Sequence, residues 1–159
     1  SGSAIGCIME GSRPMLIELQ ALVSPSAYGT PQRTITGMDR NRVLLLLAVL
    51  EKRTGFKFSD KDVYVNVAGG LKIKDPSADL ALCIALISSL LDMSIDNNKL
   101  WLGEVGLGGE LRRVNQLERR IKEAEKLGFA HAWINNNHDS KNSPSHLKDV
   151  LQSFVQKKP

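Results

Sequence analysis

Two stretches of this 159-residue chain are apolar on every side of a predicted helix, and they constrain its fold more than any other feature. The first is a helix that Asp39 caps and that runs to about Thr54, where Gly55 ends it. Residues 43–50 within it are apolar without interruption. A helix that is apolar all round is buried, so we expect it at the centre of the domain.

The second apolar helix begins after Asp75, a good N-cap, with Pro76 at the first helical position, where proline costs no hydrogen bond. We expect this helix over residues 76–91. The side chains expected to point inward follow the helical period and are Leu80, Ile84, Ile87 and Leu91. It is therefore the second helix that we expect to be buried.

Predicted strands alternate with helices along the chain. Alternating or β-branched apolar residues predict strands over residues 15–23, 63–68, 100–105 and 132–134, and a short return strand over 111–114 after a tight turn at 106–109. Loops are expected over residues 24–36 and 135–143, and further helices over 115–127 and 144–155. This alternation predicts an α/β fold.

Length and composition are those of one globular domain. A chain of 159 residues that is 42% apolar and 24% charged buries enough apolar surface to fold. We assign residues 11–159 to this domain and residues 1–10, which are small and irregular, to a cloning remnant or an interdomain linker. The longest apolar run is far shorter than the ~18 residues of a membrane span, and no basic-then-apolar leader opens the chain. We therefore expect no membrane contact.

The sequence carries no motif for a nucleotide or a metal. It contains no GxxxxGK[ST], and residues 103–109 fit no GxGxxG before a helix. Cys7 and Cys83 belong to no metal-binding pair, and we expect both to be reduced and Cys83 to be buried. No ligand spacing relates the three histidines, which are His131, His138 and His146. We expect no metal and no cofactor in this domain.

A serine lies at the start of the second buried helix, within GGLKIKDPSADLA at residues 69–81. Ser77 follows a glycine-rich strand exit, where backbone N–H groups and the helix dipole stabilise an oxyanion beside a nucleophile. Serine is also common in the first turn of a helix without any catalytic role. The local sequence leaves both interpretations open.

Four ordered blocks carry a resemblance to a known family. They are residues 10–23 (EGSRPMLIELQALV), 38–55 (MDRNRVLLLLAVLEKRTG), 62–81 (DVYVNVAGGLKIKDPSADLA) and 103–129 (GEVGLGGELRRVNQLERRIKEAEKLGF). Together they closely resemble the carboxy-terminal Lon-protease-like domain of the RadA (Sms) family of DNA repair proteins. The resemblance implies an α/β (α+β) fold like the Lon proteolytic domain, with a core like ribosomal protein S5 domain 2. It also implies that the family's zinc finger and RecA-like ATPase are absent from this chain.

The resemblance also assigns positions at a peptidase site. In active Lon-type peptidases the serine of a DGPSAG motif works with a lysine on the helix after a GE…G motif, and the lysine activates the hydroxyl. Ser77 falls at the serine position, Glu118 at the lysine position, and Asp79 replaces the motif's glycine. A carboxylate supplies no unprotonated amine and opposes the negative charge of acyl transfer. We expect a pseudo-peptidase with no catalytic residue, in which Ser77 and Glu118 are vestigial.

An active serine peptidase that uses Ser77 with a relocated lysine is the alternative. Lys122 lies one turn beyond Glu118, about 5.4 Å along the helix. Catalysis rarely tolerates displacements of even ~1 Å, which weighs against this lysine. Lys72 and Lys74 lie near Ser77 in the sequence, and spacing does not exclude them.

Basic residues point to a different role. The 21 Lys and Arg against 17 Asp and Glu give a charge of +4, which favours an anionic partner. The candidates for contacts with DNA phosphates are Arg33, Arg40, Arg42, Lys72, Lys74, Arg112 and Arg113. We expect those near the Ser77 and Gly103 motifs to converge around the former active site. The solvated mixed-charge face of a helix is expected to hold Arg119, Arg120, Lys122, Glu123 and Lys126.

The function that the resemblance implies is that of an inert domain in a DNA-dependent ATPase and branch-migration helicase of recombinational DNA repair. The domain is then a ring-assembly scaffold and a sequence-independent DNA-binding surface. The implied partners are copies of itself in a homohexameric ring, single-stranded or branched DNA, and a RecA-type recombinase through the full-length protein. ATP, Mg and Zn are implied for the missing domains. The implied location is the bacterial cytoplasm, or a mitochondrion or chloroplast for a plant protein. A pure oligomerisation scaffold that touches no nucleic acid is a third interpretation.

Overall fold

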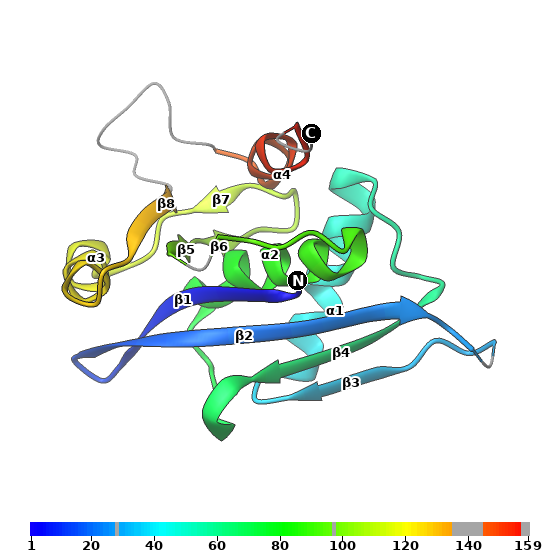
Figure 1. The fold of residues 1–159 in the computed structure, drawn as a ribbon, viewed down its shortest axis with the longest axis horizontal. Coiled ribbons are helices and arrows are strands. Elements are labelled where there is room, and N and C mark those ends of the chain that lie inside the picture. Colours follow the sequence, from blue (N-terminus) through cyan, green and yellow to red (C-terminus); the bar gives the residue numbers. More distant parts are fainter. Residues whose placement is uncertain (28, 97, 135–144, 157–159) are drawn as a thin grey trace.

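A computed structural model describes residues 1–27, 29–96, 98–134 and 145–156. The strands are β1 (Ser3–Glu10), β2 (Arg13–Pro25), β3 (Arg33–Thr36), β4 (Lys61–Val67), β5 (Lys99–Leu102), β6 (Glu104–Val105), β7 (Leu111–Arg112) and β8 (Ala130–Ile134). The helices are α1 (Arg40–Thr54), α2 (Asp79–Leu91), α3 (Leu117–Lys126) and α4 (Leu147–Gln156), with 3-10 turns η1 (Ala68–Gly70) and η2 (Pro76–Ala78). Figure 1 shows their arrangement.

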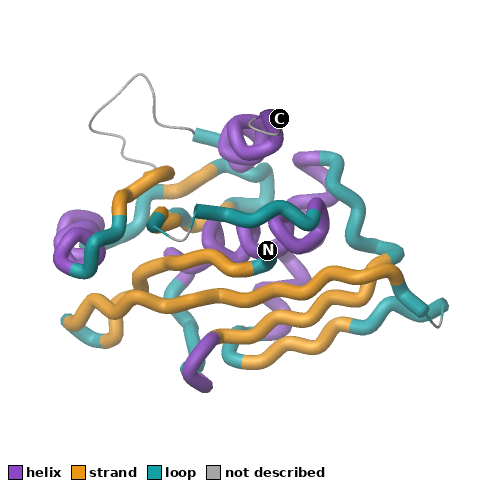
Figure 2. The backbone as a smooth tube through the Cα atoms, in the orientation of Figure 1, coloured by secondary structure: helices purple, strands orange, loops and turns teal. Residues whose placement is uncertain are grey.

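Six strands form one mixed sheet in the order β3-β4-β2-β1-β5-β8. Strand β2 is antiparallel to β1 and β4, whereas the pairs β1/β5, β3/β4 and β5/β8 are parallel. Strands β1 and β2 make the long hairpin that Figure 2 draws in orange. Strands β6 and β7 form a separate small antiparallel pair. The α/β class predicted from the sequence is confirmed.

The two-residue period of the strands divides the apolar side chains between the two faces of the sheet. On one face Ala4, Ile17 and Leu19 join the main core with α1 and α2. On the other face Cys7 and Leu100 lie in a smaller cluster beneath α3. Helix α3 therefore covers one end of the second face (Figure 1).

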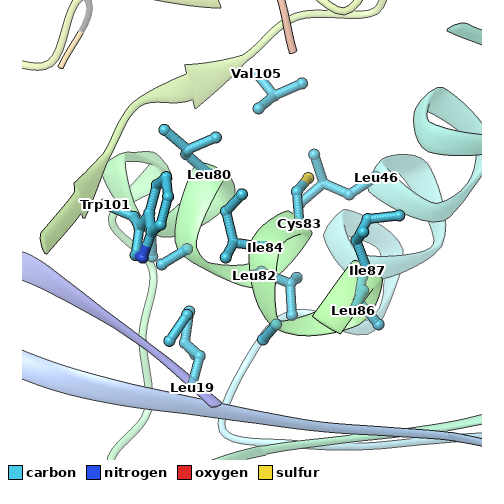
Figure 3. Packing of buried hydrophobic residues seen from close by; sticks show 14 of the residues in the cluster. Leu19, Leu46, Leu80, Leu82, Cys83, Ile84, Leu86, Ile87, Trp101 and Val105 are labelled. Carbon is cyan, nitrogen blue, oxygen red and sulfur yellow. The ribbon is translucent and has the colours of Figure 1, made fainter. Parts of the chain in front are cut away.

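The two helices that we expected at the centre are there. Asp39 caps α1 by accepting a hydrogen bond from the backbone N–H of Arg42, and Gly55 ends the helix with φ of 82°. Ten of the residues of α2, from Asp79 to Ser88, are buried. Figure 3 shows the packing of Leu80, Ile84 and Ile87 among side chains from α1, β2 and β5. The difference in burial between the inward and outward sides of α2 is small, because nearly every side of the helix is covered.

The prediction that residues 1–10 lie outside the domain is wrong for most of them. Strand β1 pairs with β2 on one side and with β5 on the other, so it lies inside the sheet. Its small residues allow close packing: a Cβ at Gly6 would lie 3.4 Å from the Cβ of Ala81. A strand that meets a helix this closely carries little of the β-branched pattern that identifies strands in a sequence.

Other boundaries differ by a few residues. The predicted loop over residues 24–36 is β strand at both ends, since β2 extends to Pro25 and β3 begins at Arg33. The predicted strand 100–105 is two strands, β5 and β6, that Gly103 separates. The predicted helix 76–91 begins with the 3-10 turn η2. The loop predicted at 135–143 lies outside the described residues.

Within the described part of the chain, no helix combines the length and apolarity needed to cross a membrane.

Candidate functional site

Ser77 lies in η2, between β1 and the start of α2. The carboxylate of Asp75 caps the turn by accepting a hydrogen bond of 3.0 Å from the Ser77 N–H, as a good N-cap should. Gly103 lies alongside, since its N–H donates to Ser77 O at 3.2 Å and its carbonyl accepts from Leu80 N at 3.1 Å. Only 2% of Ser77 is exposed. The fold thus brings the serine and the GE segment together but buries the hydroxyl.

The side chain that contacts the Ser77 hydroxyl is Arg120 of α3. Its Nη1 donates to Ser77 Oγ at 2.5 Å, to Asp75 Oδ2 at 2.8 Å and to Cys7 O at 2.8 Å. Its Nε and Nη2 donate to the backbone and side-chain oxygens of Asn115 at 2.8 and 2.5 Å. Only 1% of this arginine is exposed. One guanidinium therefore joins β1, η2 and the start of α3.

This arrangement deprives Ser77 of a base. A guanidinium stays protonated in proteins and only donates hydrogen bonds, so Arg120 accepts no proton from a serine. The Ser77 Oγ donates in turn to Cys7 O at 3.3 Å. Its role is therefore to bridge β1 and α3, while Asp75 is the residue that caps the turn.

The prediction that Arg120 lies on a solvated face is wrong. Helix α3 buries Leu117, Arg120 and Ala124, which are three and four residues apart and form one stripe. This spacing could have predicted from the sequence that Arg120 is buried. The prediction was not made because an arginine is usually assigned to the surface.

The residues at the predicted lysine position and one turn beyond it face solvent. Glu118 and Lys122 are both exposed on α3. Lys72 and Lys74 are exposed as well, whereas Ser77 is buried. Within the described residues, Ser77 Oγ is hydrogen-bonded to Cys7 O and Arg120 Nη1 rather than to a lysine.

The pKa of Asp75 reflects its position between three donors. Burial acts to raise it, but hydrogen bonds from the N–H groups of Met9 and Ser77 and from the Arg120 guanidinium bring the pKa below its ordinary value. Asp75 is therefore held as a carboxylate opposite the buried cation.

A second arginine–aspartate pair lies on the other side of the turn. Arg42 of α1 donates Nε to Asp79 Oδ1 at 3.0 Å and also pairs through Nη2 with Asp79 Oδ2. The N–H of Val105 donates to the same carboxylate at 3.0 Å. Burial nevertheless raises the pKa of Asp79. Arg42, one of the predicted DNA contacts, is thus engaged inside the protein.

A cleft of about 440 Å³ opens beside this turn. Its walls are Met38, Asp39, Arg42, Ile73, Lys74, Asp75, Pro76 and Asp79. A parallel bridge between Met38 and Ile73, with Ile73 N donating to Gly37 O at 2.7 Å, joins the start of α1 to the loop after η1. The exposed side chains of Arg40, Lys72 and Lys74 are therefore on adjoining segments at the cleft.

The other predicted DNA contacts are not among the walls of the cleft, although Arg40 donates from Nη1 to Arg33 O at 2.6 Å. Arg33 of β3 donates to the carbonyls of Lys61 and Phe58, so its guanidinium holds the β3–β4 region together. Arg112 of β7 is exposed and pairs with Glu110 at 3.2 Å. Arg113 is exposed next to it and has a partner of its own.

Cys7 and Cys83 are free and Cys83 is buried, as expected, and Cys7 is buried as well. Burial raises the pKa of Cys7 to about 11 and that of Cys83 further still, so both thiols stay protonated. Within the described residues, no three His, Cys, Asp or Glu side chains group as metal ligands would. His146 instead accepts a hydrogen bond from Lys148 N at 3.0 Å and so caps α4, while His138 lies outside the described residues.

Comparison with known proteins identifies relatives of this chain. Residues 23–137 match the family model described as ChlI, subunit ChlI of Mg-chelatase. The DNA repair protein RadA of Synechocystis is 54% identical over 134 residues, which are 84% of this chain and 26% of that protein. The RadA proteins of Bacillus subtilis and Streptococcus pneumoniae are 52% and 47% identical over 81% and 86% of this chain, and 28% and 33% of their own lengths. The chain thus spans about a third or less of these curated relatives. It belongs to the family of subunit ChlI of Mg-chelatase and is homologous to a segment of the bacterial proteins named DNA repair protein RadA.

Proposed function

We propose that this chain is a catalytically inert, Lon-like domain of a RadA-type DNA repair protein, and that it serves in ring assembly and DNA binding. The observation that carries the inert assignment is the buried guanidinium of Arg120, 2.5 Å from the Ser77 hydroxyl oxygen. A Ser–Lys peptidase needs an unprotonated amine at that place. The adjacency of Ser77 and Gly103 supports the Lon-like subclass, because these residues belong to the two motifs of the peptidase site.

An active peptidase is the less favoured candidate. A relocated lysine would have to approach a hydroxyl that is 2% exposed and already bonded to Arg120 and Cys7. Lys122 lies on the exposed side of α3, two residues beyond the arginine that occupies the site. The geometry therefore favours a structural role for Ser77.

The DNA-binding part of the proposal rests on three exposed cations. Arg40, Lys72 and Lys74 flank the cleft beside the serine, on segments joined by the bridge between Met38 and Ile73. Clustered Lys and Arg bind the phosphate backbone whatever the base sequence. Arg112 of β7, which pairs with Glu110, and the adjacent Arg113 form a second exposed basic group. Arg33 and Arg42 direct their guanidinium groups to partners within the protein, and Arg40, although exposed, also donates from Nη1 to Arg33 O at 2.6 Å.

The rest of the proposal concerns the whole protein, of which this chain is one part. The relatives are named for DNA repair, and two thirds or more of their length lies outside the matched segment. We place the ATP-dependent helicase activity in recombination, with its ATP, Mg and Zn, in those other segments. Further proposals are a homohexameric ring, a RecA-type recombinase as partner, and the bacterial cytoplasm as location.

The experiment that tests the DNA surface is a salt titration of single-stranded DNA binding. The double variant Lys72→Glu, Lys74→Glu should bind more weakly and should flatten the log–log salt slope by one unit or more, at about 0.7 per lost phosphate contact. The change should be the same for every base sequence. The matched control is Lys122→Glu, Lys126→Glu, an equal charge change on the exposed face of α3.

Either of two results would count against the proposal. Equal losses in the two double variants would mean that net charge alone governs binding and that the cleft is no specific surface. A chain that assembles into rings but binds no strand at low salt would leave only the scaffold.

A further inference from the structure

The cleft beside Ser77 has two kinds of wall. Met38, Ile73 and Pro76 give it an apolar surface, and Asp39, Asp75 and Asp79, together with the cations Arg42 and Lys74, give it a charged one. Its volume of about 440 Å³ lies within the ~300–1,000 Å³ of small-ligand sites. The cleft is therefore suited to a ligand that is flat or apolar over much of its surface and that donates hydrogen bonds.

The lining of the cleft carries three carboxylates and two cations. Arg42 is paired with Asp79, and Lys74 is exposed, so the lining keeps an excess of negative charge that is unfavourable for a phosphate group. Arg40 and Lys72 are exposed and are not among the walls of the cleft, and Arg40 also donates from Nη1 to Arg33 O at 2.6 Å. A phosphate is thus favoured beside Arg40, Lys72 and Lys74 rather than between the carboxylates.

The three carboxylates differ in their remaining capacity. Asp75 is bonded to Arg120, Met9 and Ser77, and Asp79 to Arg42 and Val105. Asp39 is exposed, and its carboxylate accepts the cap hydrogen bond of 3.2 Å from the Arg42 N–H. A carboxylate has about four lone-pair sites, so Asp39 can cap α1 and still accept from a ligand.

We propose that the cleft receives one unpaired nucleobase that carries an exocyclic amino group, while the flanking phosphates lie against Arg40, Lys72 and Lys74. This inference rests on the proposed function, because it assigns the DNA that the basic residues bind to a single strand. The base packs against Met38, Ile73 and Pro76, and its amino group donates to Asp39. Duplex DNA is excluded because its bases remain stacked and paired.

The inference adds a modest base preference to the sequence-independent phosphate contacts. Cytosine and adenine each carry an amino donor, N4 and N6, whereas thymine presents the O4 acceptor at the corresponding position. Asp39 should therefore favour cytosine and adenine over thymine. No such preference is expected if phosphates alone are bound.

The test compares three single strands of equal length and phosphate number: oligodeoxycytidine, oligothymidine and a fully abasic strand. Binding to the 159-residue chain is followed by fluorescence anisotropy at low salt and neutral pH. Oligodeoxycytidine should bind about tenfold tighter than the abasic strand, as base contacts of the kind found in single-strand binding proteins allow. It should bind about threefold tighter than oligothymidine.

The variant Asp39→Asn sharpens the test. Asparagine is as good an N-cap as aspartate, so α1 should be retained, but its amide offers donors to thymine O4. The preference for cytosine over thymine should vanish or reverse. The control Asp96→Asn makes the same change beyond the other end of α2, where Asp96 caps Asn98 N at 2.9 Å; it should leave the preference unchanged.

The possible results separate the inference from the proposed function. Equal affinity for the abasic strand and oligodeoxycytidine would overturn the base site and leave the phosphate surface standing. An unchanged base preference in Asp39→Asn would overturn the role of Asp39. Absence of binding to all three strands would overturn the proposed function and the inference with it.

Discussion

Two arginine–aspartate pairs flank Ser77, and their burial is reversed. In the pair of Arg120 and Asp75 the cation is the buried partner, with side-chain exposures of 1% and 16%. In the pair of Arg42 and Asp79 the anion is buried, with exposures of 29% and 1%. The same two residue types thus meet in opposite environments on either side of one serine.

The difference in burial determines whether the arginine of each pair could be hydrated without its aspartate. Arg42 reaches solvent, so its guanidinium can be hydrated if Asp79 is removed. Arg120 has no such access, and its guanidinium makes five hydrogen bonds, to Cys7, Ser77, Asp75 and Asn115. The Arg120 pair therefore fixes the architecture around the serine, whereas the Arg42 pair joins α1 to α2 through a cation that is partly exposed.

The largest effect is expected from Arg120→Met, which keeps much of the side-chain volume and removes the charge. Removing one partner of a buried ion pair costs ~3–5 kcal/mol. We expect about 3 kcal/mol, because Asp75 keeps its bonds from Met9 and Ser77 and is partly exposed. Urea denaturation of the variant and the parent chain measures the difference.

Arg119→Met is the control, since Arg119 is the exposed neighbour on the same helix. It should change the free energy of unfolding by less than about 0.5 kcal/mol. Similar losses in both variants would mean that α3 tolerates no substitution there and that the buried contacts of Arg120 carry no special weight.

The second prediction uses the opposite pKa shifts of the two aspartates. The pKa of Asp75 is lowered, so its contribution to stability is present above its ordinary value of 3.8 and is lost as pH falls through the folded-state pKa. The pKa of Asp79 is raised, so its contribution is present below 3.8 and is lost as pH rises through its folded-state pKa. Acidification should therefore act on the two sites in opposite directions.

The measurement is the free energy of unfolding from pH 7 to pH 3 in two variants. Asp75→Asn should lose less stability on acidification than the parent chain, and Asp79→Asn should lose more. Changes of the same sign in both variants would contradict the reversed environments of the two pairs.

The smallest effect is expected from Ser77→Ala. The hydroxyl makes two hydrogen bonds, but Arg120 and Cys7 O remain bonded to each other at 2.8 Å, so the loss should be about 1 kcal/mol. DNA binding should be unchanged. A fluorophosphonate probe should label the parent chain no more than the variant; labelling that Ser77→Ala abolishes would refute the inert assignment.

The sequence predicted the parts of the fold that local chemistry determines. Asp39 and Asp75 are N-caps because their carboxylates accept hydrogen bonds from backbone N–H groups, and Gly55 ends α1 because glycine readily adopts a positive φ. The buried helices followed from uninterrupted apolar residues. Strand β1 was missed because small residues that permit close packing resemble those of a linker.

The candidate site was harder to predict, because its contacts join distant residues. Arg42 and Asp79 are 37 positions apart, and Arg120 is 43 positions from Ser77. Comparison with the peptidase motif directed attention to Glu118, although the helical spacing of Leu117, Arg120 and Ala124 already placed an arginine on the inner side. A charged residue at an inward-facing helix position should therefore be considered as a buried, hydrogen-bonded group.

The hydroxyl of Ser77 is part of the hydrogen-bond network that joins β1 to α3, and this limits which substitutions could make it reactive. A substitution at Arg120 alone removes a cation from carboxylate and carbonyl groups that depend on it. A lysine at position 118 alone would project into solvent, as Glu118 does. A working serine–base pair therefore requires at least two substitutions, of which one is harmful alone and the other is without benefit. Under the proposed inert assignment, strong epistasis of this kind makes a nucleophile difficult to acquire by single mutational steps.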